Sequence, residues 1–335
     1  MFSSPTTFQL SAIFKFINEQ KSDPSDRSDL SEKEERRTAI KTFRQIAVLK
    51  GGFSAEREVS LQSGAAVAAG LREAGYTVTE IDVSAPDFIV PEGVEAVFIA
   101  LHGTFGEDGG AQARLEKLGV PYAGAGVDAS RVAFDKCLTE TRLREVGIPV
   151  PESEVLRRNE KRTLSLPLAV KPPRQGSSVG CHLVFEESDW GAAFADALQY
   201  DQEILIQKFI PGREFTVGIV DGEVLPIVEI VTAEGWYDYT AKYEVDTTRY
   251  VVPAKLETEK IAEIQTMALK TFEALHCRGF GRVDFRMTPN GELFVLELNT
   301  IPGFTAHSLL PKAAAAAGID FPSLCDRIIR TAGCI

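Results

Sequence analysis

Acidic, basic and amide side chains alternate with apolar residues on both sides of Asn290-Gly291. Asn-Gly between such runs predicts a β-hairpin, because both residues accept the positive φ of a tight type I′ turn. With an even-numbered loop, four polar side chains share one face of the sheet, since side chains alternate with period two. The predicted opposite pairs are Asp284 with Glu297 and Arg282 with Asn299.

Two carboxylates and an amide oxygen form a hard-oxygen set that suits Mg²⁺, which waters and substrate phosphates normally complete. An arginine beside them would stabilise charge on a transferring phosphoryl group. The same alternation also fits a hairpin whose polar face simply meets water, because cross-strand ion pairs are ordinary there. A one-residue bulge would change the pairing.

Two lysines and a small-residue loop supply the groups that phosphates need. Lys171 ends an apolar strand predicted at 168–172, and a loop rich in glycine and serine follows at 173–180. Such a loop offers many N–H groups with little bulk and could cradle phosphates, although it is as often a plain connector. Lys136, on a helix predicted at 129–146, adds a second point charge, but each lysine alone also fits an ordinary surface position.

The elements before this loop predict a parallel sheet. A strand at 46–50, a glycine-containing loop and a helix at 58–74 form a β-loop-α start, and further strands follow at 76–82 and 96–101. The glycine-rich loop 102–110 follows a strand's carboxyl end, where open α/β sheets usually bind ligands.

Glu56 lies just before the first predicted helix. Its loop lacks both GxGxxG and GxxxxGK[ST], the patterns of phosphate loops. An acid there would repel phosphate and attract an ammonium group. A helix N-terminal acid is also simply favourable for the helix dipole.

The second half of the chain predicts an antiparallel layer. Strands are expected at 203–209, 213–220 and 223–231, with a turn at Asp221-Gly222, and a helix at 257–275 precedes the hairpin. The aromatic and polar loop 235–243 is too uneven for a core strand and is a candidate lid.

Length and composition favour a compact cytosolic protein. A chain of 335 residues fits two or three domains, and 44% hydrophobic with 25% charged residues is typical of globular proteins. The net charge of −12 argues against a nucleic-acid surface, and five cysteines without a CxxC pattern argue against zinc and disulfides. The sequence contains no apolar run of 18 residues that would predict a membrane span, and residues 10–14 do not resemble a signal peptide.

Residues 1–44 are predicted to be an extension outside the fold, either disordered or partly helical.

Eight motifs follow one another between residues 46 and 332: GGFSAEREVS, LHGTFGEDG, FDK, KPPRQGSSVG, REFTVG, YDYTAKY, GRVDF and ELNTIPGFTAHSL. Together they resemble the D-alanine–D-alanine ligase family of ATP-grasp enzymes, although each alone is weak. The resemblance implies a three-domain α/β (α+β) ATP-grasp fold, with the nucleotide held between two antiparallel sheets. The implied parts are the extension 1–44, a Rossmann-like N-terminal domain at 45–124, a central domain at 125–206 and a C-terminal domain at 207–335.

By this resemblance, ATP drives the ligation of two D-alanines through a D-alanyl phosphate, for peptidoglycan precursor synthesis. The implied cofactors are two Mg²⁺ ions, with Mn²⁺ as the expected substitute. The resemblance further implies a cytoplasmic homodimer that uses small-molecule substrates and no nucleic acid or membrane partner.

The resemblance also implies roles for individual residues. Those in catalysis are Glu56, Ser177, Arg282 and Ser308. Those that bind substrate are Glu56, His102, Tyr243, Arg282, Gly303, Ser308 and Leu309. Those that bind the nucleotide are Lys136, Lys171, Ser177, Ser178, Gln207, Lys208, Phe209, Ile210, Glu214, Lys242 and Asn299. The metal ligands are Asp284, Glu297 and Asn299.

In the implied site, Glu56 holds the first ammonium and links with Ser177 and Tyr243 as a latch. The Arg282 guanidinium and the backbone N–H of Gly303 form the oxyanion site. A ligase for D-lactate or D-serine, another ATP-grasp ligase and a non-catalytic amino-acid-binding module are the alternatives. Tyr243 resembles the D-alanine-specific members, and Gln207 stands where the family often has an acid near the adenine.

Overall fold

The computed structural model describes residues 43–232, 248–305 and 307–334. The chain from Phe43 onward forms one compact unit. The predicted lid at 235–243, including Lys242 and Tyr243, lies outside the described residues, as does nearly all of the predicted extension. Within the described ranges, no helix combines the length and apolar composition needed to cross a lipid bilayer.

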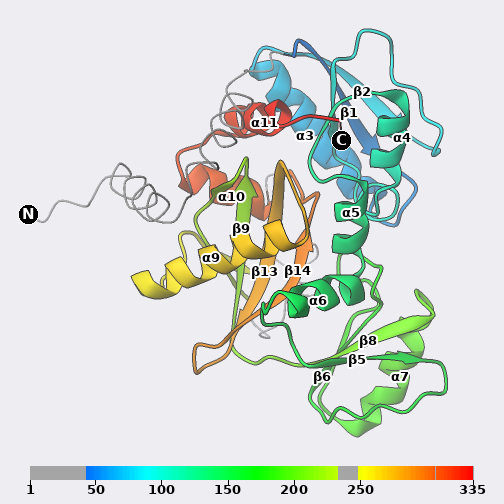
Figure 1. The fold of residues 1–335 in the computed structure, drawn as a ribbon, viewed down its shortest axis with the longest axis vertical. Coiled ribbons are helices and arrows are strands. Elements are labelled where there is room, and N and C mark those ends of the chain that lie inside the picture. Colours follow the sequence, from blue (N-terminus) through cyan, green and yellow to red (C-terminus); the bar gives the residue numbers. More distant parts are fainter. Residues whose placement is uncertain (1–42, 233–247, 306, 335) are drawn as a thin grey trace, which may run out of the picture. The chain divides into compact units, whose positions relative to one another are not determined.

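The first sheet is parallel, as predicted, with its strands in the order β2, β1, β3, β4 (blue and cyan in Figure 1). Its strands are β1 (Gln45–Gly51), β2 (Thr77–Val83), β3 (Ala96–Ile99) and β4 (Tyr122–Ala123). Alternate residues of β1 pack in two separate apolar clusters, one with α3 (Arg57–Glu73) and one with α4 (Gly110–Leu118). Because both faces of β1 and β3 are buried, these two strands are nearly continuous apolar runs, whereas the edge strand β2 is largely exposed.

The second sheet is antiparallel, in the order β5, β8, β6, β7. Its strands are β5 (Ser153–Arg157), β6 (Leu168–Lys171), β7 (His182–Val184) and β8 (Glu203–Lys208). One face packs against α7 (Glu187–Ala197) through Leu168, Val170, Ile204 and Ile206. Lys171 and Gln207 therefore belong to the opposite face, because side chains alternate along each strand.

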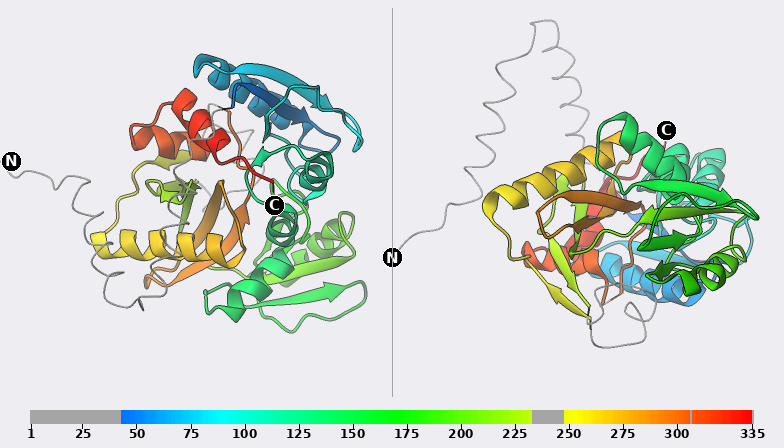
Figure 2. Two further views of the ribbon diagram at one scale, coloured as in Figure 1. Left: turned by 45° about the horizontal axis from the view of Figure 1, so that its top comes forward. Right: turned by 90° about the horizontal axis from the view of Figure 1, so that it is seen from below.

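The third sheet is also antiparallel, in the order β12, β11, β9, β13, β14, with β10 paired to β9. Its strands are β9 (Arg213–Val220), β10 (Glu223–Val224), β11 (Val228–Val231), β12 (Arg249–Val251), β13 (Phe280–Met287) and β14 (Leu293–Asn299). Phe215, Val217, Val283 and Phe285 pack toward α9 (Thr258–Ala274), which lies along the sheet in Figure 2. The polar residues between them, including Arg282 and Asp284, therefore share the other face.

The hairpin pairs are as predicted, but the turn is not. Asp284 pairs with Glu297 and Arg282 with Asn299, and the register then shifts by one residue at a bulge beside Phe285. The connection is residues 288–292, in which the Gly291 N–H donates to the Thr288 carbonyl at 2.9 Å.

Only one of the two central residues has the backbone conformation that a type I′ turn requires. Gly291 has a φ of 86°, whereas Asn290 is not among the described residues with positive φ. The type I′ prediction is therefore wrong here, and an odd-numbered connection and a bulge cancel to restore the predicted pairs. Positive φ at both central residues occurs instead at Asp221-Gly222, which joins β9 to β10.

The helix predicted at 129–146 is two helices, α5 (Val127–Phe134) and α6 (Lys136–Glu145). Asp135 between them has extended backbone, and its carboxylate accepts from the N–H groups of Cys137 and Leu138 at 2.9 and 3.2 Å. Asp135 thus caps the second helix, as short acidic side chains do. Likewise the strand predicted at 223–231 is interrupted, because Pro226 has no N–H for a sheet ladder.

Two helices close the chain, α10 (Leu309–Ala316) and α11 (Phe321–Arg330). Both contribute apolar residues to the cluster that includes α3 and β1, for example Leu310, Leu324 and Ile328. Residues 300–305, which follow the hairpin, are thereby held near the carboxyl ends of the parallel strands, where His102 contacts Ile301.

Candidate active site

The polar side chains on one face of the hairpin are joined by hydrogen bonds and are not simply exposed to water. Arg282 donates from Nε and Nη2 to both carboxylate oxygens of Asp284, at 2.9 Å each. Asn299 Nδ2 donates to the same carboxylate at 3.0 Å, and Thr216 donates from the neighbouring strand at 2.5 Å. Asp284 is only 8% exposed, so the alternative of a hairpin that simply meets water does not hold.

Lys136 brings a second helix to this face. Its Nζ lies 3.3 Å from Glu297 Oε2 and donates to the carbonyl oxygen of Gln175 at 2.8 Å. Burial alone would lower the pKa of Lys136, but the nearby Glu297 carboxylate outweighs it and the pKa is raised. One lysine therefore connects the hairpin with the loop at 173–180.

The donor set fits a hard divalent cation. Asp284 and Glu297 are directly opposite on adjacent strands, and Asn299 adds an amide oxygen from the same face. Within the described ranges, no group of three or more His, Cys, Asp and Glu side chains could hold a metal ion, so an all-protein cage is not offered there. Two carboxylates with an amide leave coordination positions for water and phosphate, which is the usual pattern for Mg²⁺.

Glu56 and Ser177 come together from segments far apart in the sequence. The Ser177 hydroxyl donates to the Glu56 carboxylate in a short hydrogen bond, and Ser177 itself has a positive φ of 50°. A side chain at Gly176 would place its Cβ 2.7 Å from Glu56 Oε2. Glycine at this position therefore lets the loop reach the acid.

His102 is buried and holds two segments together. Its Nδ1 lies 3.1 Å from the carbonyl oxygen of Ile301, which can only accept, so Nδ1 carries the hydrogen. Its Nε2 lies 3.0 Å from Ser63 Oγ. The same hydroxyl oxygen accepts a hydrogen bond from the Phe304 N–H at 3.2 Å. His102 thereby fixes the segment that contains Gly303.

Gly303 and Ser308 lie against each other at the start of α10. A Cβ at Gly303 would stand 2.7 Å from Ser308 Oγ. That hydroxyl accepts from the Thr305 N–H at 2.9 Å, and Leu309 next to it is 4% exposed. Ser308 precedes the first turn of α10, whose N–H groups favour an anion such as a carboxylate.

Glu107 lies 3.6 Å from His102 Nδ1, and burial raises the pKa of its carboxyl to about 7. The folded protein therefore keeps a proton that the unfolded chain loses near the ordinary carboxyl pKa. Between these two values its contribution to stability falls as the pH rises. Replacing Glu107 with Gln should flatten the pH dependence of the free energy of unfolding between about pH 5 and about pH 7, by up to about 1.4 kcal/mol per pH unit.

Urea denaturation at a series of pH values measures this slope. The matched control is Glu58→Gln on the exposed side of α3, which should leave the slope unchanged. Parallel curves for Glu107→Gln and the unaltered protein would contradict the prediction.

The residues predicted to surround the nucleotide lie where the chain passes from β8 to β9. Glu214 pairs with Arg286 at 2.9 Å, and Arg286 also donates to the carbonyl oxygen of Ile210 at 3.0 Å and stacks on the Phe209 ring. This arginine therefore holds the connecting segment against the third sheet. Lys208 differs, because its Nζ donates to the carbonyl and hydroxyl oxygens of Ser165 at 2.9 Å.

Lys171 is 7% exposed at the end of β6, and burial lowers its pKa. The charges of Lys136 and Glu297 also act on it, in opposite directions. The two lysines predicted to bind phosphate thus lie within electrostatic range of each other and of the hairpin. A polyanion between them would offset their mutual repulsion.

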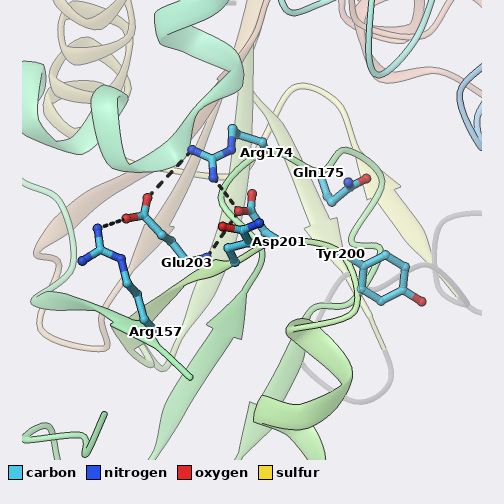
Figure 3. Close-up of a pocket in the computed structure, with 7 residues that line it drawn as sticks. Arg157, Arg174, Gln175, Tyr200, Asp201 and Glu203 are labelled. Carbon is cyan, nitrogen blue, oxygen red and sulfur yellow. Dashed lines mark hydrogen bonds and ion pairs between the residues drawn. The ribbon is translucent and has the colours of Figure 1, made fainter. Parts of the chain in front are cut away.

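A hollow of about 560 Å³ lies beside this region, and none of the predicted site residues lines it. Figure 3 shows Arg174 directed toward Asp201 and Glu203, two of the residues that line it. Arg174 also bonds Asp135 at 3.1 Å, next to Lys136. The ion pairs of Arg174 thus hold the start of the loop at 173–180, and the next residue, Gln175, accepts a hydrogen bond from Lys136 through its carbonyl oxygen.

Sequence reasoning missed four residues of this arrangement: Ser63, Glu107, Thr216 and Arg286. Arg286 follows Arg282 and Asp284 at period two, so the alternation already indicated its face. Glu107 lies in the glycine-rich loop that was singled out for ligand binding. Ser63 and Thr216 gave no signal, because a single hydroxyl in a helix or strand is ordinary.

A family model described as "D-ala D-ala ligase C-terminus" matches residues 143–330. A D-alanine–D-alanine ligase from Syntrophotalea carbinolica is 46% identical over 291 residues, which are 85% of this chain and 95% of that protein. The crystal structure of D-alanine–D-alanine ligase from Bacillus anthracis complexed with ATP matches with a TM-score of 0.76 and 32% identity, over 86% of this chain and 97% of that one. The VanG D-Ala:D-Ser ligase of Enterococcus faecalis matches with a TM-score of 0.74 and 31% identity, over 86% of this chain and 99% of that one.

A parallel α/β sheet followed by two antiparallel sheets, with a buried lysine on one and paired carboxylates on the other, defines the ATP-grasp class of ligases. A relative that is 46% identical over 85% of this chain is similar enough to establish the family. The chain belongs to the D-alanine–D-alanine ligase family.

Proposed function

We propose that the cluster on the hairpin face is the phosphoryl-transfer end of the active site. The protein is an ATP-dependent, ADP-forming ligase that joins two D-alanines for peptidoglycan precursors. The observation that carries the assignment of the site is the convergence of Arg282, Asp284, Glu297 and Asn299 on one face, with Lys136 reaching it from α6.

In this proposal, a carboxylate oxygen of the first D-alanine attacks the γ-phosphorus of ATP and ADP leaves, which gives D-alanyl phosphate. The amine of the second D-alanine then attacks the acyl carbon and loses a proton, and inorganic phosphate leaves. Lys136 and Lys171 hold phosphate oxygens, and Ser177 and Ser178 line them from the loop. Bound to Asp284, Glu297 and Asn299, two Mg²⁺ ions would neutralise phosphate charge. Arg282 and the backbone N–H of Gly303 stabilise the oxyanion of the tetrahedral intermediate.

The amino-acid sites follow from the remaining contacts. Glu56 attracts the first ammonium group, and its hydrogen bond to Ser177 closes the loop over the site. His102 positions the backbone after Ile301, and Ser308 with Leu309 receives the second carboxylate at the start of α10. Exclusion of water would protect the acyl phosphate from hydrolysis.

The remaining proposals rest on the resemblance. The nucleotide lies between the second and third sheets, beside Gln207, Lys208, Phe209, Ile210 and Glu214, and Lys242 and Tyr243 close over it. The domains are 45–124, 125–206 and 207–335, after an extension at 1–44. The enzyme works in the cytoplasm as a homodimer, and Mn²⁺ is able to substitute for Mg²⁺.

Phosphate release from ATP, measured with D-alanine, L-alanine, D-lactate and D-serine in turn, tests the substrate assignment. We expect Mg²⁺-dependent release with D-alanine, formation of D-alanyl-D-alanine, and little release with L-alanine. Release that is indifferent to D-alanine would overturn the proposal. A D-serine ligase is less favoured, because three curated relatives that are 45–46% identical over 85–86% of this chain are D-alanine–D-alanine ligases.

A further inference from the structure

A buried carboxylate on α6 has no part in the mechanism above. Glu140 is 2% exposed, and its two oxygens accept hydrogen bonds from three side chains. Arg144 Nη2 donates to Oε2 at 2.8 Å, and Ser153 Oγ donates to the same oxygen at 2.5 Å. Gln207 Nε2 donates to Oε1 in a short hydrogen bond. Burying a carboxylate is costly unless it is paired in this way.

Gln207 belongs to the sheet face that carries Lys171. It pairs with Ala169 across β6 and with Ser153 across β5, so its side chain shares their face. Lys171 is two residues beyond Ala169 and lies on the same face. The charge of Glu140 also reaches Lys171 and raises its pKa against the effect of burial. Glu140 therefore acts on the face where the proposed function places the nucleotide.

The bond to Glu140 decides which way the Gln207 amide faces. A carboxylate paired with arginine only accepts hydrogen bonds, so Gln207 must present its NH₂ group to it. Among the described residues, Glu140 is the one side-chain hydrogen-bond partner of Gln207. The amide carbonyl oxygen is consequently turned away from Glu140 and fixed as an acceptor. Without Glu140 the amide could flip and present a donor instead.

We propose that Glu140 is a positioning residue that makes the nucleotide site selective for a base with an exocyclic amino group, by holding the Gln207 carbonyl toward it. This inference rests on the proposed function for the location of the nucleotide. A fixed acceptor pairs with the 6-amino group of adenine and faces the 6-carbonyl group of hypoxanthine or guanine unfavourably. A buried polar group that is left unpaired discriminates more strongly than a lost apolar contact.

The test compares ATP with inosine triphosphate, which has the same phosphates and ribose but a carbonyl at position 6. The unaltered enzyme should prefer ATP in kcat/KM. Glu140→Gln should lower the ATP-to-inosine-triphosphate ratio roughly tenfold, because a neutral amide can bond Gln207 in either orientation. Since the reacting groups are unchanged, kcat at saturating ATP should stay within about threefold.

Two further variants keep the test decisive. Gln207→Met leaves Glu140 with Arg144 and Ser153, and should lower the ratio by a similar factor even if Glu140→Gln folds poorly. The exchange Glu140→Gln with Gln207→Glu puts an obligate acceptor at 207, and should restore the ratio. A role confined to stability would not move the ratio or be rescued in this way.

The matched control is Glu145→Gln, an exposed acid on the same helix that pairs with Arg142. It should leave both the ratio and the midpoint of thermal unfolding unchanged. Folded Glu140→Gln and Gln207→Met enzymes whose ratios stay within about twofold of the unaltered enzyme would overturn the proposal. If D-alanine does not drive phosphate release at all, the proposed function fails, and calorimetric affinities for ADP against inosine diphosphate still decide the inference.

Discussion

Arg282→Ala should reduce D-alanine-dependent phosphate release by at least about a thousandfold, the effect expected when an arginine that stabilises a phosphoryl transition state is lost. The Arg282 side chain is 14% exposed and its guanidinium bonds both oxygens of Asp284, so it is held rigidly where charge would develop. A preorganised cation in a partly dry site is worth far more than one in water. Steady-state assays at saturating ATP and D-alanine measure the loss.

The variant also removes a buried ion pair, so folding must be measured beside activity. Asp284 keeps Thr216 and Asn299 as donors, and we therefore expect a folded protein with a lower unfolding midpoint. Arg249→Ala on the edge strand of the same sheet is the matched control, because that arginine is exposed. A folded Arg282→Ala enzyme with more than about a tenth of normal activity would refute the role.

Glu297→Gln should reduce activity by about a hundredfold to a thousandfold and raise the Mg²⁺ concentration needed for half-maximal rate. The change keeps size and shape but removes one of two facing carboxylates. It also deprives Lys136, 3.3 Å away, of its ion-pair partner. Both effects weaken the binding of a metal–nucleotide complex.

Titration of Mg²⁺ in the assay, and the thermal shift given by Mg²⁺ with ADP, provide two independent readouts. Glu292→Gln in the exposed connection between β13 and β14 is the control, and it should behave like the unaltered enzyme. An unchanged Mg²⁺ requirement together with a normal thermal shift would show that Glu297 is not a ligand.

The hairpin shows what the local pattern of apolar and polar residues can and cannot predict. Alternation of apolar and polar residues gave the faces of β13, because successive side chains of a strand point to opposite sides. On β14 it is correct only from Glu297 to Asn299, because the bulge places Val295 on the face that packs against α9. It correctly paired Asp284 with Glu297 and Arg282 with Asn299. The turn was misread, and the pairs are correct only because the bulge offsets the longer connection. Loop conformation depends on a few weak preferences that neighbouring strands can override.

The predicted boundaries of helices and strands were wrong where a single residue changed the backbone conformation. Asp135 interrupts a continuous helical pattern because its side chain caps the next turn, which places Lys136 at the start of α6. That position is what lets the lysine meet both Glu297 and Gln175. The same short sequence would be compatible with an unbroken helix, so spacing alone could not reveal the break.

The sequence by itself determined the parallel sheet, the polar hairpin face, the glycine and serine loop and the motifs that resemble the ligase family. Each of these is local, because it depends on the stereochemistry of a few consecutive residues. Tertiary structure alone decided that Lys136 meets Glu297 and that Glu140 accepts a hydrogen bond from Gln207. These contacts join segments that only the packing of sheets and helices brings together. Such packing reflects the sum of many weak apolar contacts, and no short motif encodes that sum.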